Sequence, residues 1–292
     1  MTRSVETDGP VLVAASLSGE ADASWARAAA PYVDYAIMGG IALDPASRAA
    51  ARDLVERERA EFLPDDPTEW IDRQLHALEG VSVRLGVNVR SATVDPVREA
   101  GVVCADHDAI CEINAHCRQP ELRAAGCGET LLADVDRLRE YVAAAAGTGA
   151  TTSVKVRAEV AGVDLAAVAV AVAEAGADWI HVDAMDSEPA IADVSEAVSG
   201  HGLDLAVVAN NGVRDRDTVA EYVAYGADAV SVGRPSDDPR VLSRVAEAVA
   251  EWGDADAVDD DTERDRNRRS ERDRDRRSER DRDRRGKRGV SS

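Results

Sequence analysis

A parallel (β/α)8 barrel is the fold that the sequence predicts for residues 10–252, on three observations. Eight short apolar segments alternate with segments of helical character. The apolar segments are nearly continuous runs of Val, Ile, Ala and Leu, as in strands that are buried on both faces. The first of them ends in Ser16-Leu17-Ser18-Gly19, without the GxGxxG turn that an open dinucleotide-binding sheet carries there. Eight such units are typical of a closed TIM barrel and not of a doubly wound sheet.

The expected strands are the apolar runs between polar or glycine-containing turns. They cover residues 10–17, 33–38, 81–89, 109–114, 152–157, 178–183, 203–210 and 228–232. Several expected helices begin at a proline, a residue that suits the first helical turn because its missing N–H would be unpaired there anyway. The helices are expected over residues 22–32, 45–62, 67–78, 96–105, 130–146, 164–175, 189–198, 216–225 and 239–252.

The two ends differ from the barrel in composition. Residues 1–9 are polar and are expected to be flexible. In residues 253–292 the octapeptide RRSERDRD occurs twice in succession, at 268–275 and 276–283. Such a segment has almost no apolar surface to offset the entropy of ordering, so it is expected to be disordered. Residues 262–292 carry 14 basic and 8 acidic residues, which indicates either a weak tether for RNA or another partner, or a low-complexity tail of no specific role.

The negative charge lies in the predicted barrel. Residues 1–250 hold 42 acidic and 21 basic residues, and residues 251–292 hold 14 of each, which together give the net charge of −21. The only lysines are Lys155 and Lys287. This composition is typical of halophilic proteins, because salt screens the repulsion between surface carboxylates. An ordinary acidic protein from a GC-rich genome is the alternative.

Localisation signals are not apparent in the sequence. The N-terminus MTRSVETDGP has no apolar core of a signal peptide, and no apolar run approaches the roughly 18 residues of a membrane span. Four cysteines in a chain of 292 residues do not suggest a disulfide framework. We therefore expect a cytoplasmic protein that does not enter a membrane.

Polar residues gather where the expected strands end, which is where a (β/α)8 barrel carries its active site. In the fourth strand Glu112 and Asn114 share one face, and Cys111 and Ile113 share the other. The polar pair should point into the barrel, because burying it against helices is costly. The fifth strand presents Lys155, the barrel's one lysine. A lysine in a chain that otherwise uses arginine suggests a role for a compact single charge.

The loops after the last two strands are candidates for binding phosphate. They read Asn210-Asn211-Gly212 and Gly233-Arg234. Small residues allow backbone N–H groups to approach a phosphate, and an arginine can cover it. A simple turn is the alternative for the first of these loops.

A metal site is not expected. Cysteine and histidine residues do lie near one another in the sequence, but no CxxC pair is present. The candidates would be Cys104, His107, Cys111, His116, Cys117 and Cys127.

Taken in order, these residues resemble the dihydrouridine synthase family of FMN-dependent barrels, in particular a shorter archaeal branch, over most of residues 10–245. The segments EINAHCRQP and GCGETLL are similar to EINMGCP and GAGAALL in that family. Likewise VKVR is similar to VKIR, NNGV to GNGD, and GADAVSVGR to GADGVMIGR. The family is distantly related to dihydroorotate dehydrogenase.

The resemblance implies FMN as cofactor, NAD(P)H as electron source, and roles for individual residues. Cys117 matches the catalytic cysteine that protonates the uracil ring carbon. Contacts to the flavin are implied for Asn88, Lys155, Gly212, Gly233 and Arg234. Asn210, in the first of the phosphate-loop candidates, and Asp183, at the position of a flavin-binding residue of the family, are expected to contact it as well. Contacts to the substrate are implied for Asn114 and Arg157. His116 and Arg118, which the family lacks, are expected to bind an anionic small substrate or a tRNA phosphate.

Three features depart from the family pattern. His116-Cys117-Arg118 stands in place of Gly-Cys-Pro, Asp183 stands where a flavin-binding histidine is usual, and the charged tail replaces a helical tRNA-binding domain. The expected function is reduction of the C5–C6 bond of uridine in tRNA. The alternatives are a small-molecule flavoenzyme of the dihydroorotate or dihydropyrimidine dehydrogenase type, and a non-catalytic barrel that binds a phosphate-bearing ligand or RNA.

Overall fold

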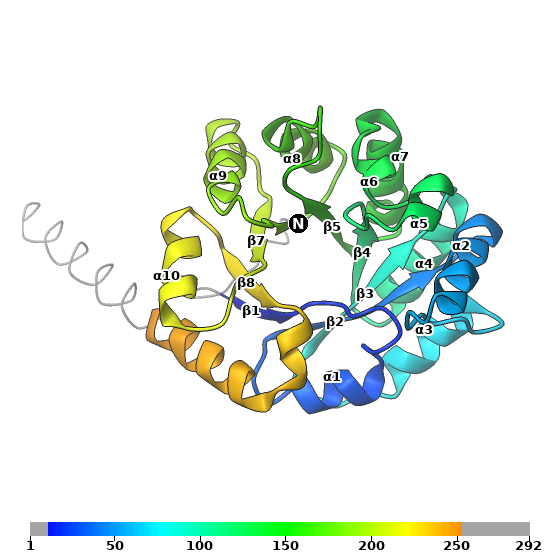
Figure 1. Cartoon of the computed structure of the whole chain (residues 1–292), viewed down its shortest axis with the longest axis horizontal. Helices are drawn as coiled ribbons and strands as arrows, with labels where there is room; N and C mark the ends of the chain where they lie inside the picture. Colours follow the sequence, from blue (N-terminus) through cyan, green and yellow to red (C-terminus); the bar gives the residue numbers. More distant parts are fainter. Residues whose placement is uncertain (1–10, 253–292) are drawn as a thin grey trace, which may run out of the picture.

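The computed structural model describes residues 11–252 and confirms the barrel (Figure 1). Eight parallel strands pair in chain order, and β8 pairs with β1 to close the sheet. The strands are β1 (Val11–Ala14), β2 (Tyr35–Ala42), β3 (Arg84–Arg90), β4 (Ile110–Asn114), β5 (Thr151–Arg157), β6 (Trp179–Asp183), β7 (Ala206–Asn210) and β8 (Ala229–Val232). The expected flexible N-terminus (1–9) and disordered tail (253–292) lie outside the described residues.

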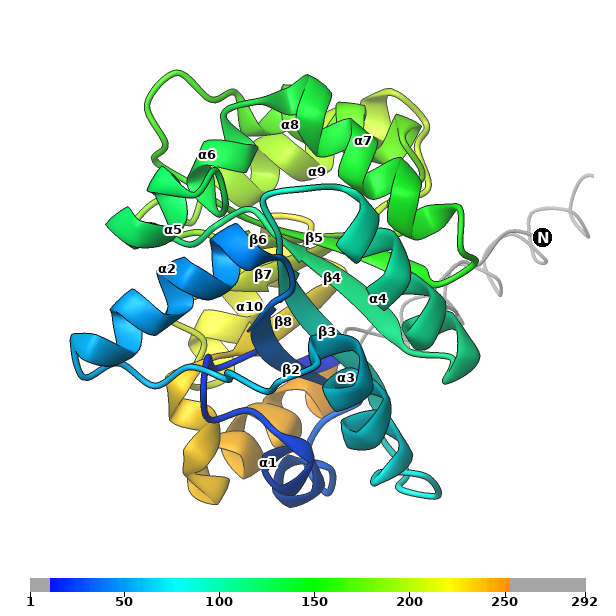
Figure 2. The same cartoon turned by 90° about the vertical axis from the view of Figure 1, so that its right-hand side faces the viewer.

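Helices surround the strands, as the view from the side shows (Figure 2). They are α1 (Ala23–Ala29), α2 (Pro45–Glu56), α3 (Pro67–His76), α4 (Asp95–Asp106), α5 (Pro120–Ala124), α6 (Glu129–Leu132), α7 (Val135–Ala146), α8 (Leu165–Glu174), α9 (Ala190–Gly200), α10 (Arg216–Ala224), the 3-10 helix η1 (Arg234–Asp237) and a last helix over 239–252. Within residues 11–252, none of these helices has the length and apolarity needed to cross a membrane.

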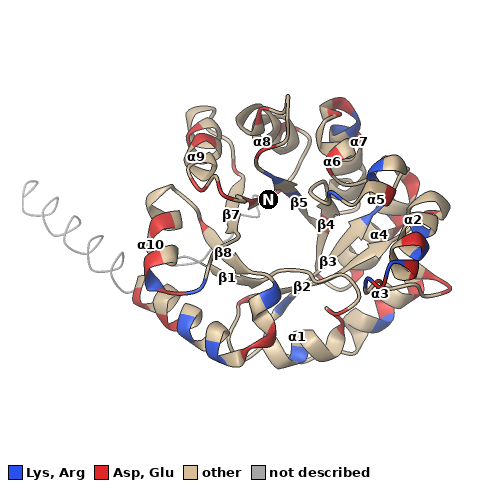
Figure 3. Ribbon diagram, in the orientation of Figure 1, with Lys and Arg blue, Asp and Glu red and all other residues tan. Residues whose placement is uncertain are grey.

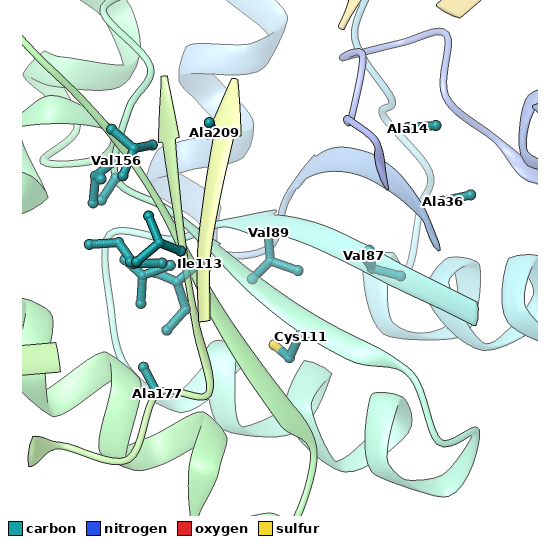
Figure 4. Close-up of a cluster of buried hydrophobic side chains, with 14 of the residues drawn as sticks. Ala14, Ala36, Val87, Val89, Cys111, Ile113, Val156, Ala177 and Ala209 are labelled. Carbon is teal, nitrogen blue, oxygen red and sulfur yellow. The ribbon is translucent and has the colours of Figure 1, made fainter. Parts of the chain in front are cut away.

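The main hydrophobic core lies between the outer face of the sheet and the helices (Figure 4). It takes alternate residues from each strand, for example Val87 and Val89 from β3 and Cys111 and Ile113 from β4. Cys111 belongs to this outer core, whereas its neighbour Ile110 belongs to the interior cluster, which confirms that Cys111 faces away from the barrel interior.

The barrel interior changes from apolar to polar along its axis. At the end where the strands begin, Val13, Ile37, Ile110 and Trp179 pack together. Two residues further along β4 and β6, the inward positions are occupied by Glu112 and His181. The strand register therefore places a polar layer directly above an apolar layer inside the barrel. The polar layer forms the floor of the opening at the C-terminal ends of the strands.

Two of the expected helices differ from the structure by more than three residues. The helix expected over 45–62 ends at Glu56. Beyond it, Phe62 pairs with Ile41 and packs on Trp70, with ring centroids 4.7 Å apart. These tertiary contacts outweigh the helical propensity of the segment.

The helix expected over 130–146 is in fact two helices, α6 and α7, and the preceding loop holds a third, α5. Asp134 separates α6 from α7. Its carboxylate accepts a hydrogen bond of 3.2 Å from the backbone N–H of Arg137. This N-terminal cap favours a new helix start.

Candidate active site

One pocket of about 650 Å³ opens at the C-terminal ends of the strands. This volume is within the range of pockets that hold cofactors or drug-sized ligands. It is lined by Ser16, Leu17, Ser18, Arg59, Glu61, Asn114, His116, Cys117, Arg118, Gln119, Lys155, Arg157, Asp183, Met185, Asn210, Asn211, Gly212, Val213, Arg214, Ser231, Gly233, Arg234 and Pro235. The loops after β1, β4, β5, β6, β7 and β8, and the segment after α2, all contribute.

The pocket is basic although the protein is acidic. Six arginines or lysines line it, against two acidic residues, while the chain as a whole carries a net charge of −21. Acidic residues are spread over the surrounding helices (Figure 3). A concave site of one sign concentrates ligands of the opposite sign. The pocket is therefore suited to an anionic ligand.

The loop after β4 brings Cys117 to the pocket. Asn114, at the end of the strand, accepts hydrogen bonds from the backbone N–H groups of His116 (3.4 Å) and Cys117 (3.2 Å). The other side of the loop is fixed by Gly128, which has a φ of 61°. A Cβ at Gly128 would lie 2.1 Å from the Cys117 carbonyl oxygen. Only glycine allows the two backbone segments to approach this closely.

Cys117 differs from the other cysteines in its exposure. It is half-buried and lines the pocket, whereas Cys104, Cys111 and Cys127 are fully buried. Burial raises the pKa of the Cys127 thiol to about 12. A thiol that reacts with a ligand or donates a proton to it must be reachable from the pocket. Cys117 is therefore the candidate for a reactive or proton-donating thiol.

A buried hydrogen-bonded network lies beneath the pocket floor, centred on Glu112. Its Oε1 accepts from Asn88 Nδ2 at 2.7 Å, and its Oε2 lies 2.7 Å from His181 Nδ1. Ser153 Oγ also donates to Oε2, at 3.3 Å. On the far side of the imidazole, His181 Nε2 lies 2.7 Å from Ser231 Oγ.

The charges of this network follow from its surroundings. Burial opposes the ionisation of Glu112, but His181, Lys155 and the bond from Asn88 outweigh it and lower the pKa of the carboxyl to about 2. Burial and the nearby Lys155 lower the pKa of His181, against the attraction of Glu112. Near neutral pH the pair therefore consists of a carboxylate and a neutral imidazole.

Lys155 lies at the floor of the pocket. It is 3% exposed and pairs in register with Asn114 of β4 and His181 of β6. Burial lowers its pKa, while the negative charges of Glu112 and Asp183 oppose that shift. A buried lysine beside a pocket is a candidate partner for a ligand with negative charge or a carbonyl oxygen.

Two buried donor or acceptor atoms near the Cys117 loop have no partner among the described residues. They are Nδ1 of His116 and Nε of Arg157, and both residues line the pocket. Burial and Lys155 lower the pKa of His116 well below its usual value, so the ring is neutral near pH 7. Arg157 also pairs with Glu129 at 3.2 Å. Buried polar atoms without partners are costly, and a polar ligand group in the pocket would satisfy them.

The loops after β7 and β8 form the opposite wall. Asn210 donates to the Ser231 hydroxyl at 2.6 Å. Gly212 has a φ of 68°, which only glycine adopts without strain. A Cβ at Gly233 would meet no atom within 4 Å, and Arg234 is exposed beside it. This wall has room and positive charge for an anionic group such as a phosphate.

Eleven of the twelve residues predicted for the site line this one pocket. The exception is Asn88, which is fully buried and bonded to Glu112 and Asn114 below the pocket floor. Their roles toward a ligand stay predictions. Within residues 11–252 no group of three His, Cys, Asp or Glu side chains could hold a metal ion.

The prediction missed the segment after α2, which contributes Arg59 and Glu61 to the pocket. Glu61 pairs with the buried guanidinium of Arg90, at 3.2 Å from Oε1 to Nη1. Arg90 also donates to Ser18 Oγ at 3.1 Å. Arg90 directly follows the strand expected over residues 81–89. The sequence gave no signal for its partner, because the two lie on separate elements. Ser231, in contrast, could have been found by alternation from Gly233.

The comparisons with known proteins identify the fold and not the family. No protein-family model matches the chain. An uncharacterized protein of Methanocaldococcus jannaschii is 26% identical over 227 residues, which is 76% of this chain and 88% of that protein.

Three redox enzymes are among the similar solved structures. A dihydroorotate dehydrogenase of Eimeria tenella in complex with ferulenol has a TM-score of 0.59 at 14% identity, covering 82% of this chain and 80% of that one. A morphinone reductase in complex with tetrahydroNAD has a TM-score of 0.56 at 12% identity, covering 80% and 86%. A mandelate oxidase has a TM-score of 0.51 at 16% identity, covering 84% and 73%. At such low sequence identities these similarities establish the fold alone. They agree with the (β/α)8 barrel that the strand order shows.

Proposed function

We propose that this protein is an FMN-dependent oxidoreductase of the dihydrouridine synthase type, which reduces the C5–C6 bond of a pyrimidine ring. The observation that carries the proposal is the pocket itself. In a strongly acidic protein it gathers six basic residues and places Cys117 and Lys155 on the same cavity. The similar folds of dihydroorotate dehydrogenase, morphinone reductase and mandelate oxidase, which are flavin-dependent oxidoreductases, support it.

The residues of the pocket fit FMN. Gly212, Gly233 and Arg234 offer an open, cationic wall for its phosphate. Lys155 supplies a buried positive charge for the electron-rich edge of the ring system. We expect Asp183 and Asn210, which also line the pocket, to contact the cofactor. Bound FMN would supply the hydride, with NAD(P)H as the source of electrons.

The protein's own contribution to the reaction is a proton and a fixed geometry. Cys117 is held by Asn114 on one side and by the close approach of Gly128 on the other. Its thiol would donate the proton to one carbon of the pyrimidine double bond as the hydride adds to the other. His116, Arg118 and Arg157 would bind the substrate's polar groups beside it.

The substrate proposed is uridine in tRNA. Arg59, Arg118, Arg214 and Arg234 are more exposed than Lys155 and stand around the pocket, where they could contact the phosphates next to a flipped base. In a protein of net charge −21, such a local basic rim would be needed to hold a polyanion.

FMN binding is the first test. The protein purified in high-salt buffer should be yellow, or should take up added FMN with quenching of flavin fluorescence. Lys155→Met should weaken the binding by about tenfold or more, because one buried charge contact is lost. Arg98→Met, a change on the surface of α4, is the matched control. A colourless protein that takes up no FMN would overturn the proposal.

A small pyrimidine is the second candidate substrate. It is favoured by the unpartnered, buried Nδ1 of His116 and Nε of Arg157, which a compact anionic group could satisfy. Deleting the gene and measuring dihydrouridine in total tRNA separates the candidates. A fall in dihydrouridine supports the tRNA substrate, and an unchanged level supports the small molecule.

A further inference from the structure

The polar network inside the barrel has two arms that meet at Glu112. The loop arm runs from the backbone N–H of Cys117 through Asn114 and Asn88 to Glu112 Oε1. The serine arm runs from Asn210 through Ser231 and His181 to Glu112 Oε2. The two arms thus link the loop that carries Cys117 with the wall assigned to the phosphate.

The donor direction of the loop arm is fixed by the backbone. A backbone N–H can only donate, so the atom of Asn114 that faces Cys117, at 3.2 Å, must be its carbonyl oxygen. The amide nitrogen of Asn114 must then face Asn88, and it donates to Asn88 Oδ1 at 2.8 Å. Asn88 in turn offers its Nδ2 to Glu112 at 2.7 Å. Each orientation follows from the previous one, so this arm cannot be reversed.

The serine arm starts from a fixed acceptor but can adapt at the hydroxyl. Asn210 Nδ2 lies 3.2 Å from the backbone carbonyl of Ser231, which can only accept, so this atom is the amide nitrogen. The same Nδ2 donates to Ser231 Oγ. The hydroxyl proton of Ser231 then has two acceptors, His181 Nε2 at 2.7 Å and the carbonyl of Ala209 at 3.3 Å.

The two arms and Ser153 direct donors at the two oxygens of Glu112, and only an ionised carboxylate accepts from all of them. We propose that Glu112 is a positioning residue for the reaction proposed above, the shared acceptor that fixes the Cys117 loop on one side and the orientation of His181 and Ser231 on the other. It lines neither the pocket nor the surface, so it would act through these neighbours. The inference rests on the proposed function for its catalytic consequence only.

The geometry makes a specific prediction for Glu112→Gln. A glutamine has one acceptor and one donor in place of two acceptors. Since the loop arm cannot reverse, the glutamine oxygen must stay with Asn88 and its NH2 must face His181. His181 would then move its proton from Nδ1 to Nε2, and Ser231 would turn its hydroxyl to Ala209.

Nitrogen NMR of 15N-histidine-labelled protein reads this change directly. The chain has only five histidines, and His181→Gln assigns the signal. In the wild type at neutral pH we expect His181 to be neutral with its proton on Nδ1. In Glu112→Gln we expect the proton on Nε2. Thr152→Val, a buried change on β5 whose hydroxyl donates to the carbonyl of Ala150 at 3.2 Å, should leave the signal unchanged. A wild-type proton on Nε2, or the same tautomer in both proteins, overturns the inference.

The loop arm is tested by the reactivity of Cys117. The other three cysteines are fully buried, so iodoacetamide should modify Cys117 alone, which Cys117→Ala verifies. Asn88→Ala removes the hydrogen bonds that connect Asn114 to Glu112 below the pocket. It should change the alkylation rate by about fivefold, which corresponds to the net free energy of one hydrogen bond. An unchanged rate overturns this half of the inference.

Turnover supplies the catalytic readout. Glu112→Gln should lower kcat by about tenfold or more while changing KM less, because the loss falls on the geometry of the proton donor and not on substrate contacts. An equal kcat overturns the positioning role. Neither the NMR measurement nor the alkylation needs flavin or substrate, so failure of the proposed function would be recognised separately.

Discussion

In the proposed function, the proton-transfer chemistry of the site depends on Cys117. Its thiol lines the pocket, while its backbone is held by Asn114 and by the approach of Gly128. The fixed backbone defines where the thiol can deliver a proton. General acids of this kind contribute about 10²- to 10⁴-fold to a rate.

Replacing Cys117 with alanine should therefore lower kcat by about 10²-fold or more. FMN affinity should stay within about twofold, because the residues proposed to hold the phosphate and the ring system lie on other strands. Stopped-flow turnover and fluorescence titration measure the two quantities. Cys104→Ala, in the outer core, should cost stability but leave kcat unchanged. Wild-type turnover in Cys117→Ala would show that Cys117 is not the acid.

Two histidines, His181 in the buried network and His116 on the pocket wall, make stability depend on pH. The pKa values of His116 and His181 are both lowered, chiefly by burial. Between the folded values and the usual value near 6.5, the unfolded chain binds more protons than the folded one. The free energy of unfolding should therefore fall as the pH drops through that window, by up to about 1.4 kcal/mol per pH unit for each histidine.

His116→Asn should reduce this acid sensitivity, because one of the two groups is removed. Urea unfolding at pH of about 7.5 and about 5.5 measures the difference. His76→Asn, at an exposed position, is the control and should behave as the wild type does. An acid sensitivity that is the same in all three proteins would contradict the assignment.

At the scale of elements, the turn between α5 and α6 shapes the pocket. Gly128 has a positive φ of 61° and no room for a Cβ, since the Cys117 carbonyl would be 2.1 Å away. Gly128→Ala should lower the free energy of unfolding by about 2 kcal/mol or more, and should shift the Cys117 loop. Thermal unfolding and the alkylation rate of Cys117 measure these effects.

Gly80→Ala is the matched control for this change. Gly80 also has a positive φ, of 79°, but a Cβ there would meet no atom within 4 Å. It should cost only the backbone strain, about 1 kcal/mol, and leave Cys117 unaffected. Equal effects of the two substitutions would contradict a specific role for the close approach at Gly128.

The order of strands and the inward-facing residues could be predicted from sequence, because both follow local rules. Buried parallel strands read as apolar runs, and alternation placed Glu112 and Asn114 inside and Cys111 outside. The segment after α2 could not be predicted. Its path over the barrel mouth is set by the Glu61–Arg90 pair and by Phe62 on Trp70, contacts between residues far apart in sequence.

For the site, the strand ends supplied most of the pocket, but the network beneath it was not visible from sequence. A Glu, a His and a Ser on β4, β6 and β8 carry no motif spacing. They meet only because the barrel closes and the register aligns Glu112, His181 and Ser231 across its interior. Closure is a global property, so a local pattern cannot reveal it.

At the scale of the whole molecule, the net charge of −21 should make stability depend on salt. The Debye length falls from about 10 Å at 0.1 M to about 3 Å at 1 M, so repulsion between carboxylates weakens. We expect Tm to rise steadily with KCl into the molar range. Sucrose, which strengthens apolar burial without screening charge, should raise Tm less. A Tm that is unchanged or lower in molar KCl would contradict salt adaptation.

In the proposed function, the basic pocket of an acidic barrel binds flavin and reduces a pyrimidine, with Cys117 as the acid. The most direct test is a single-turnover experiment without oxygen, in which the FMN-loaded, chemically reduced protein is mixed with tRNA that lacks dihydrouridine or with small pyrimidines. We expect one of them to restore the oxidised flavin spectrum in the wild type, and to do so about 10²-fold more slowly in Cys117→Ala. A flavin that stays reduced with both would contradict it.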